Sequence, residues 1–113
     1  NIGEPNIIYL GSPEGFYRES VVFDLDSDNS YSISAGDLDL DGDIDIVVGN
    51  VRGVNNVFIN SENGQKWKKK PLINKNFHTY DVLINDLNDD GKPDIIESNS
   101  GEKNIYYFNV TNN

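Results

Sequence analysis

An acidic stretch with a single glycine, Asp37-Leu38-Asp39-Leu40-Asp41-Gly42-Asp43-Ile44-Asp45, decides how this chain is interpreted. Acidic side chains occupy its odd positions, and glycine stands at position 6. The same frame returns downstream as Asp86-Leu87-Asn88-Asp89-Asp90-Gly91-Lys92-Pro93-Asp94. Oxygen-bearing side chains therefore fall at positions 1, 3, 5 and 9 of both stretches.

This pattern of oxygens suits a hard cation. Calcium takes about six to eight oxygen ligands, at about 2.3–2.6 Å. Alternate side chains of a short loop can point inward around such an ion, and glycine at position 6 permits the sharp turn back. Position 7 then offers its backbone carbonyl, and position 9 another carboxylate. The sequence predicts two Ca²⁺ sites, with ligands from Asp37, Asp39, Asp41, Asp43 and Asp45 in the first and from Asp86, Asn88, Asp90, Lys92 and Asp94 in the second.

A solvated turn, an EF-hand and a magnesium site fit these loops less well. A solvated acidic β-turn accounts for one copy, but not for two copies in one register. The second loop has Glu97 at position 12, as an EF-hand does, but the first has Val48 there and neither loop has helical flanks. Magnesium prefers fewer protein ligands in a strict octahedron. Because the first loop carries more negative charge, including the spare Asp43, we expect it to bind calcium more tightly.

The step between the two loops is 49 residues, and it extends well beyond them. It also relates Tyr31 to Tyr80 and Asn60 to Asn109, without slippage. A fixed period of this length is typical of repeat proteins. The chain is thus one 49-residue unit copied about two and a third times: a partial unit over residues 1–29, a full unit over 30–78 and a unit lacking its last strand over 79–113.

Each full unit carries four strand signals. In the unit 30–78 they cover residues 31–36, 44–48, 57–60 and 67–73, with a turn expected at 49–53. The next unit repeats the first three strands, and residues 7–10 and 16–23 match strands three and four. Four strands per about 40–50 residues is the spacing of a propeller blade. The predicted fold class is therefore all-β, with four-stranded antiparallel blades of a β-propeller and no helix.

These segments resemble the FG-GAP/VCBS repeat family, the calcium-binding β-propeller blades of integrin α-chains and many bacterial surface proteins. Residues 36–48 and 85–96 resemble its core motif, and residues 56–60 and 104–109 resemble the strand that follows. The resemblance implies a metal loop between strands one and two of each blade, with the ligands named above. It also implies that these sites stabilise the blade and lie away from the partner surface.

Propellers of this family usually have about seven blades, so the small number of units can arise in two ways. The chain is either a fragment of a longer protein, completed by further blades, or a protomer that self-associates into a ring. It begins and ends at strand three, which gives nine strands where two whole blades need about eight. The extra strand favours the fragment.

Composition narrows the classes of partner. The net charge is −10, and nine of the 19 acids lie inside the two loops, so the acidity is mostly local. Nucleic acid is not expected as a partner, because phosphate binding needs a basic surface. Apolar runs are too short to insert into a membrane. Cysteine is absent, which removes disulfides and thiolate chemistry. Calcium sites of moderate affinity favour an extracellular, cell-surface or periplasmic location.

Several residues outside the loops could be interpreted as functional, but we expect structural roles for them. The lysine run Lys66, Lys68, Lys69 and Lys70 is expected to protect a solvated edge strand. Residues 24–29 mimic a third acidic loop but lack the glycine, so a solvated loop is expected. His78 is also expected to be solvated, Trp67 to pack between units, and the sequon at Asn109 to be fortuitous.

No catalytic constellation is visible, because the clustered carboxylates are already assigned to calcium. The sequence therefore predicts a non-enzymatic, calcium-stabilised module for adhesion or ligand binding, with a protein or glycan partner. One alternative is a lectin-like surface with Trp67, Tyr17 or Tyr107 as sugar platforms. Another is the propeller part of a polysaccharide-degrading enzyme, whose catalytic residues would lie outside these 113 positions.

Overall fold

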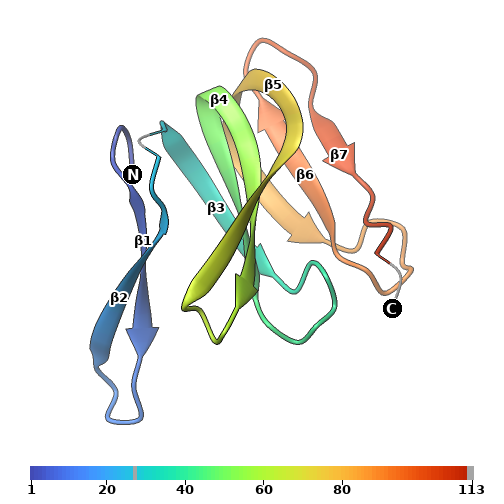
Figure 1. The fold of residues 1–113 in the computed structure, drawn as a ribbon. Helices are drawn as coiled ribbons and strands as arrows, with labels where there is room; N and C mark the ends of the chain where they lie inside the picture. Colours follow the sequence, from blue (N-terminus) through green and yellow to red (C-terminus); the bar gives the residue numbers. More distant parts are fainter. Residues whose placement is uncertain (27, 112–113) are drawn as a thin grey trace.

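The computed structural model describes residues 1–26 and 28–111, and the regular structure in these ranges is all β-strand (Figure 1). Within these residues no helix is long and apolar enough to cross a membrane. The strands are β1 (Asn6–Gly11), β2 (Tyr17–Asp24), β3 (Ser30–Gly36), β4 (Asp45–Ser61), β5 (Lys66–Asn85), β6 (Asp94–Asn99) and β7 (Ile105–Tyr107). This confirms the all-β prediction.

Two antiparallel sheets hold these strands. β1 and β2 form a two-stranded hairpin, and the other strands form a five-stranded sheet in the order β3-β4-β5-β6-β7. β4 and β5 are 17 and 20 residues long, and each bends at the top of Figure 1 so that its second half runs back alongside the sheet. The turn expected at 49–53 lies at the fold in β4, but it does not interrupt the strand: Val51 and Gly53 pair with His78 and Phe77 of β5.

Successive units approach closely where β3 and β4 meet β5, and glycine permits this. A Cβ added to Gly49 would lie 2.9 Å from Val82 Cγ1 and 3.0 Å from Thr79 Cγ2. A Cβ added to Gly36 would lie 3.0 Å from Ile84 Cγ2. Larger residues at these positions would therefore push the two units apart.

The core consists of two apolar clusters, each between neighbouring units. The first joins Phe23 of β2 to Ile46, Val48 and Phe58 of β4, with Trp67 packed against them. The second joins the unit 30–78 to the unit 79–113 through Leu38, Val47, Val57, Val82 and Ile95. Trp67 lies 5.7 Å from Phe23 between ring centroids, which confirms that it packs between units.

A buried asparagine crosses each junction between units, and we call this contact the asparagine joint. At the first joint Asn6 Nδ2 donates to Ser30 Oγ (2.9 Å), which in turn donates to Asn50 Oδ1 (2.9 Å). At the second joint Asn55 Nδ2 donates to Thr79 Oγ1 (2.7 Å), which donates to Asn99 Oδ1 (2.6 Å). Corresponding residues of the two joints stand one repeat apart in the sequence.

One prediction about the first junction holds at Leu25 and Asp26, which are exposed, but is wrong at Asp24. Residues 24–29 were expected to form a solvated loop, but Asp24 is 1% exposed and its Oδ1 lies 3.3 Å from Lys69 Nζ. The same ammonium contacts Asp26 and lies 3.9 Å from Asp28 Oδ2, while Ser27 falls outside the described residues. Lys69 is thus the counter-ion of this acidic segment, although the residue is exposed like the rest of the lysine run. Partial burial lowers its pKa, but the carboxylates of Asp26 and Asp24 outweigh this and raise the pKa overall.

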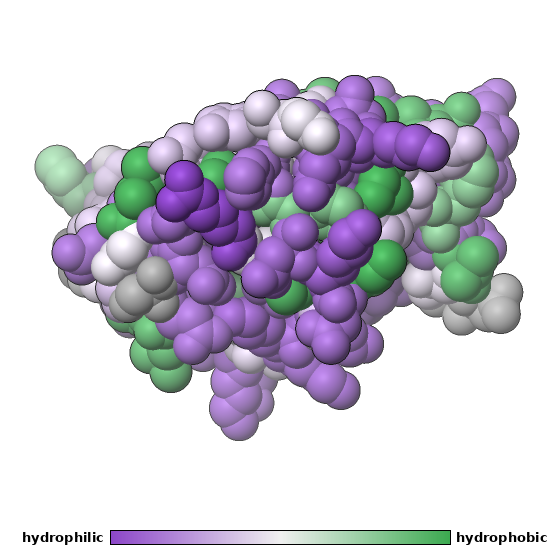
Figure 2. Space-filling view, turned by 90° about the horizontal axis from the view of Figure 1, so that it is seen from above, coloured by the Kyte–Doolittle hydropathy of each residue, from purple (hydrophilic) through white to green (hydrophobic). Residues whose placement is uncertain are grey.

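Hydrophobic side chains are visible at both ends of the molecule when it is viewed from above, at the left and at the right, and others lie between them (Figure 2). They include Ile7, Tyr9, Phe16 and Tyr17 at the first end, and Leu87, Tyr106 and Phe108 at the second, each between 40% and 76% exposed. His78 is exposed, as expected. Both ends of the row of units thus expose apolar side chains, as the middle unit does at Tyr31, Ile33 and Ile44.

Candidate metal centre

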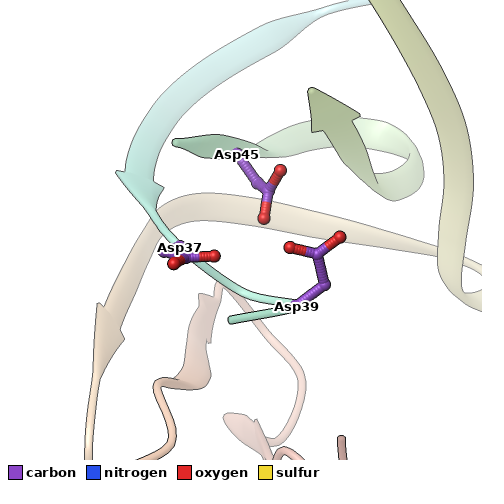
Figure 3. A group of neighbouring side chains, drawn as sticks. All are labelled: Asp37, Asp39 and Asp45. Atoms are coloured by element: carbon purple, nitrogen blue, oxygen red, sulfur yellow. The ribbon is translucent and has the colours of Figure 1, made fainter. Parts of the chain in front are cut away.

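Three carboxylates of the first acidic loop converge where β3 passes into β4. Asp37 follows the end of β3, Asp39 lies in the loop, and Asp45 is the first residue of β4. Figure 3 shows their side chains directed toward one another. One oxygen of each lies within 4.8 Å of the others. These are three of the five ligand residues that the sequence predicts for the first site.

Carboxylates of the loop accept hydrogen bonds from its own backbone amides and so fix its turn. Asp37 accepts from the amides of Asp41 (Oδ1, 3.1 Å) and Gly42 (Oδ2, 2.9 Å). Asp41 Oδ1 accepts from the Asp43 amide at 2.8 Å, so the chain turns back within a few residues. Two residues have left-handed backbone angles, Leu40 with φ of 61° and Gly42 with φ of 94°. The glycine at position 6 is therefore needed for the turn, as the sequence suggested.

Asp45 anchors the loop to the sheet. It is fully buried, its Oδ2 accepts from the Leu38 amide (2.8 Å), and its Oδ1 accepts from the Asn60 amide (2.9 Å). Asn60 Nδ2 also donates to Ile44 O at 3.0 Å. Burial raises the pKa of Asp45 despite these amides. Burial, the Asp41 side chain and the Asp45 charge raise the pKa of Asp39 to about 6. Like charges are thus crowded here, and a bound cation would relieve that crowding.

The second loop repeats this arrangement almost bond for bond. Asp86 accepts from the amides of Asp90 (3.2 Å) and Gly91 (2.8 Å), and Asp90 accepts from Lys92 (3.0 Å). Asp94 is fully buried and accepts from Leu87 (2.8 Å) and Asn109 (2.8 Å), as Asp45 does from Leu38 and Asn60. Asp89 and Gly91 repeat the left-handed angles, with φ of 58° and 82°.

Asn88 differs from Asp39, its counterpart in the first loop. The terminal atom of its amide that faces the loop lies 3.2 Å from Asp86 Oδ1 and 3.0 Å from Asp90 Oδ1. Without a cation the amide nitrogen fits this position best, because it donates to both carboxylates. A cation would instead favour the amide oxygen there, which makes a third oxygen donor. The carboxylate, amide and carbonyl oxygens of both loops therefore fit a hard cation such as Ca²⁺.

The predicted ligands divide into two groups. Asp37, Asp39 and Asp45 are brought together, and Asp86, Asn88 and Asp90 are brought together one repeat later. Asp41 and Asp90 also hold the amide at position 7 of their loops, which belongs to Asp43 and Lys92. The participation of Asp43 and Lys92 as carbonyl ligands stays a prediction.

Sequence reasoning missed the asparagine that links the two loops. Asn109 Nδ2 donates to Pro93 O (2.9 Å) in the second loop and to Leu38 O (2.6 Å) in the first. The signal was present, because Asn60 and Asn109 stand one repeat apart. The side-chain amide of Asn109, which is also the asparagine of the sequon, thus donates two hydrogen bonds within the structure.

The repeated loop geometry agrees with the comparison to known families. A family model described as FG-GAP-like repeat matches residues 37–97, more than half of the chain. The chain belongs to the FG-GAP-like repeat family. The matched FG-GAP-like segment contains both acidic loops and the Asn55–Thr79 contact of the second asparagine joint. No curated protein and no solved structure matches the chain.

Proposed function

We propose that this FG-GAP-like chain is a calcium-binding β-propeller repeat module in which Ca²⁺ holds each acidic loop closed. The observation that carries the proposal is the convergence of Asp37, Asp39 and Asp45 within 4.8 Å, with the same loop backbone repeated at Asp86–Asp94. When bound, calcium supplies charge compensation. The chain's own residues supply the turn, the oxygen donors and the buried anchors Asp45 and Asp94.

The strands group naturally into propeller blades under this proposal. β3, the two halves of β4 and the first half of β5 make one four-stranded blade. The second half of β5, β6 and β7 make the first three strands of the next blade, and β1 and β2 supply the last two of the preceding one. The buried clusters and asparagine joints between these groups support a row of stacked blades.

The role that we propose is non-enzymatic ligand binding or adhesion, outside the cell, at its surface or in the periplasm. The carboxylates that cluster in the described residues are engaged in loop geometry or, at the first junction, with Lys69. The two metal loops lie at the same end of the sheets, where β3 passes into β4 and β5 into β6. The surfaces away from this end are therefore available to a partner. The calcium sites contribute to the stability of the fold.

A direct test is calcium titration of the chain by calorimetry and thermal unfolding. We expect two ions per chain and a higher unfolding midpoint, because a ligand that binds only the folded state stabilises it by about 2.7 kcal/mol at about 100 times its Kd. Asp39→Ala should remove one ion, whereas Asp89→Asn, at an exposed acid outside the ligand positions, should remove none. If calcium changes neither the midpoint nor the heat signal beyond that of NaCl at equal ionic strength, the proposal is wrong.

The lectin-like alternative loses support at two of its three platforms. Trp67 packs against Phe23, and its indole N–H donates to Gly64 O (2.9 Å). The hydroxyl of Tyr107 is buried beside Glu97, and burial followed by the Glu97 charge raises its pKa. Tyr17 is 76% exposed and can stack on a sugar ring. Binding on a glycan array that disappears with Tyr17→Ser would favour this second function.

A further inference from the structure

One asparagine holds the backbone of both acidic loops. Asn109 follows β7, and the segment that carries it reaches the end of the sheets where both loops lie (Figure 1). Its Nδ2 donates to Leu38 O in the first loop (2.6 Å) and to Pro93 O in the second (2.9 Å). Its backbone amide donates to Asp94 Oδ1 (2.8 Å), the buried anchor of the second loop. Asn109 therefore bridges two loops that lie in different units.

A continuous chain of hydrogen bonds joins the two buried anchors through this bridge. Asp45 Oδ2 accepts from the Leu38 amide (2.8 Å), and the carbonyl of Leu38 accepts from Asn109. Leu38 stands between positions 1 and 3 of the first loop, both of which supply carboxylates. A movement of these positions is thus passed to Asp94 through Asn109.

Apolar packing joins the same two loops. The side chain of Leu38 is 7% exposed and belongs to the core cluster that also contains Val82 and Ile95. Ile95 directly follows Asp94, the last residue of the second loop. An opening of the first loop that withdraws Leu38 would lose this burial next to the second loop. The closed form of each loop therefore supports the closed form of the other.

We propose that the two acidic loops bind calcium with positive cooperativity, and that the side chain of Asn109 transmits the coupling. This inference rests on the calcium binding proposed above. When an ion holds the first loop closed, the Leu38 carbonyl stays in place for Asn109, and the ordering cost of the second loop falls. Because linkage is reciprocal, an ion in the second loop favours binding in the first by the same factor.

Direct repulsion between two divalent cations works in the opposite direction. This repulsion weakens with salt, because the Debye length is about 8 Å at about 0.15 M ionic strength. Coupling through the hydrogen-bonded bridge does not need charge and persists under these conditions. The sign of the measured coupling therefore separates the bridge from simple electrostatics.

Calorimetric calcium titration of the full chain in about 0.15 M NaCl measures this coupling. The Kd of the second loop is obtained with the first loop filled and again in Asp39→Ala, which removes the first ion. We expect the second loop to bind about fivefold more tightly when the first is filled. In Asn109→Ala, measured alone and together with Asp39→Ala, this ratio should fall to about one, because the bond to Leu38 is lost.

Asn60 offers the matched control, since it stands one repeat before Asn109. Among the described residues its Nδ2 donates to Ile44 O, within the first loop, and to no other loop. Asn60→Ala therefore loosens the first loop without breaking a bond between loops. It should lower the affinity of the first loop and keep the ratio at about fivefold.

A second measurement leaves the bridge itself unchanged, so it stands even if Asn109→Ala does not fold. In Asp86→Ala, which removes a ligand of the second loop, calcium bound to the first loop should shift the NMR signals of the Asn109 side-chain amide and of the Asp94 backbone amide. The dispersion of the same spectra verifies that each variant is folded.

The outcomes separate this inference from the proposed function. Absence of any calcium heat would overturn both. Two bound ions with a ratio near one, a second ion that binds more weakly, a ratio that persists in Asn109→Ala or disappears in Asn60→Ala, or unshifted Asn109 signals in Asp86→Ala would each overturn the coupling alone.

Discussion

Tyr31 and Tyr80, which stand one repeat apart in the sequence, meet edge to face with ring centroids 5.2 Å apart. Next to them, Ser32 Oγ donates to Asp81 Oδ1 (2.7 Å) and accepts from the Val82 amide (3.2 Å). Ser34 Oγ accepts from Ile84 in the same way at 3.1 Å. The first strand of one unit thus lies directly against the first strand of the next, and small polar side chains of β3 bind the backbone of β5.

The serine contacts give a first prediction. Ser32→Ala should lower the free energy of unfolding by about 1 kcal/mol, because it removes two hydrogen bonds at a partly exposed site. Urea denaturation of the variant measures this loss. Ser98→Ala, at an exposed position of β6, is the matched control and should change stability by less than about 0.5 kcal/mol. A loss of similar size in both variants would argue against a specific contact between units.

The asparagine joint gives a second prediction, because the same residue is buried at the junction and exposed one repeat later. Asn55 is buried and donates to Thr79 Oγ1 and to Glu97 Oε2, whose carboxylate is fully buried. Asn55→Ala should cost about 3 kcal/mol, since it leaves a buried charge short of a partner. Asn104→Ala, at the exposed counterpart, should cost about 1 kcal/mol by removing its bond from the Asn99 amide.

The free energies of unfolding of these two asparagine variants should be compared under the same conditions. The difference separates the contribution of the contact between units from that of the contact within the turn. Equal losses would mean that Asn55 acts only within its own turn, where its Oδ1 accepts from the Asn50 amide.

Lys69 gives a third prediction, at the first junction. Lys69→Met keeps most of the side-chain volume but leaves the buried carboxylate of Asp24 without its cation. We expect a loss of about 1–2 kcal/mol, less than for a fully buried pair because the lysine side chain is 33% exposed. Lys68→Met, on an exposed residue of the same strand, should be nearly neutral. Thermal unfolding in low and high salt measures both, and the Lys69 effect should survive salt better than a surface pair would.

The unequal charge of the two loops gives a fourth prediction. The first loop has five carboxylates and the second has four, one of them the exposed Asp89. Calcium should therefore bind the first loop more tightly, and Asp41→Ala should reduce total affinity more than Asp90→Ala does. Isothermal titration of the two variants makes the comparison. A larger loss in the Asp90 variant would reverse the order of the sites.

Much of this fold follows from the sequence because identical residues recur at a fixed step. The alternation of Tyr31 to Gly36 marks β3, and the doubly apolar run at Ile46 to Val48 marks a strand covered on both faces, as the core clusters show. The glycine at position 6 marks the turn in each loop. Local signals of this kind depend on the backbone and on neighbours in the chain, so a single sequence contains them.

Contacts between units were harder to predict, because they join residues that the sequence separates and the repeat does not always preserve. Lys69 finds its acids more than 40 residues earlier, and no charge rule along one strand selects it from four lysines. Val48 and Phe58 of one unit become Glu97 and Tyr107 in the next, an exchange of an apolar pair for a polar one. Only the arrangement in space shows that each pair occupies one site.

Each asparagine joint takes its amide from one unit and its hydroxyl from the following one, and this has a consequence for how such a gene can lengthen. An in-frame duplication of one whole unit restores every joint wherever its breakpoints fall, because the copied amide always meets a copied hydroxyl. A partial duplication that copies the amide without the hydroxyl of the following unit leaves a buried polar group without a partner. Selection on this contact would therefore permit growth by complete units and remove partial ones, which keeps the spacing of the chain uniform.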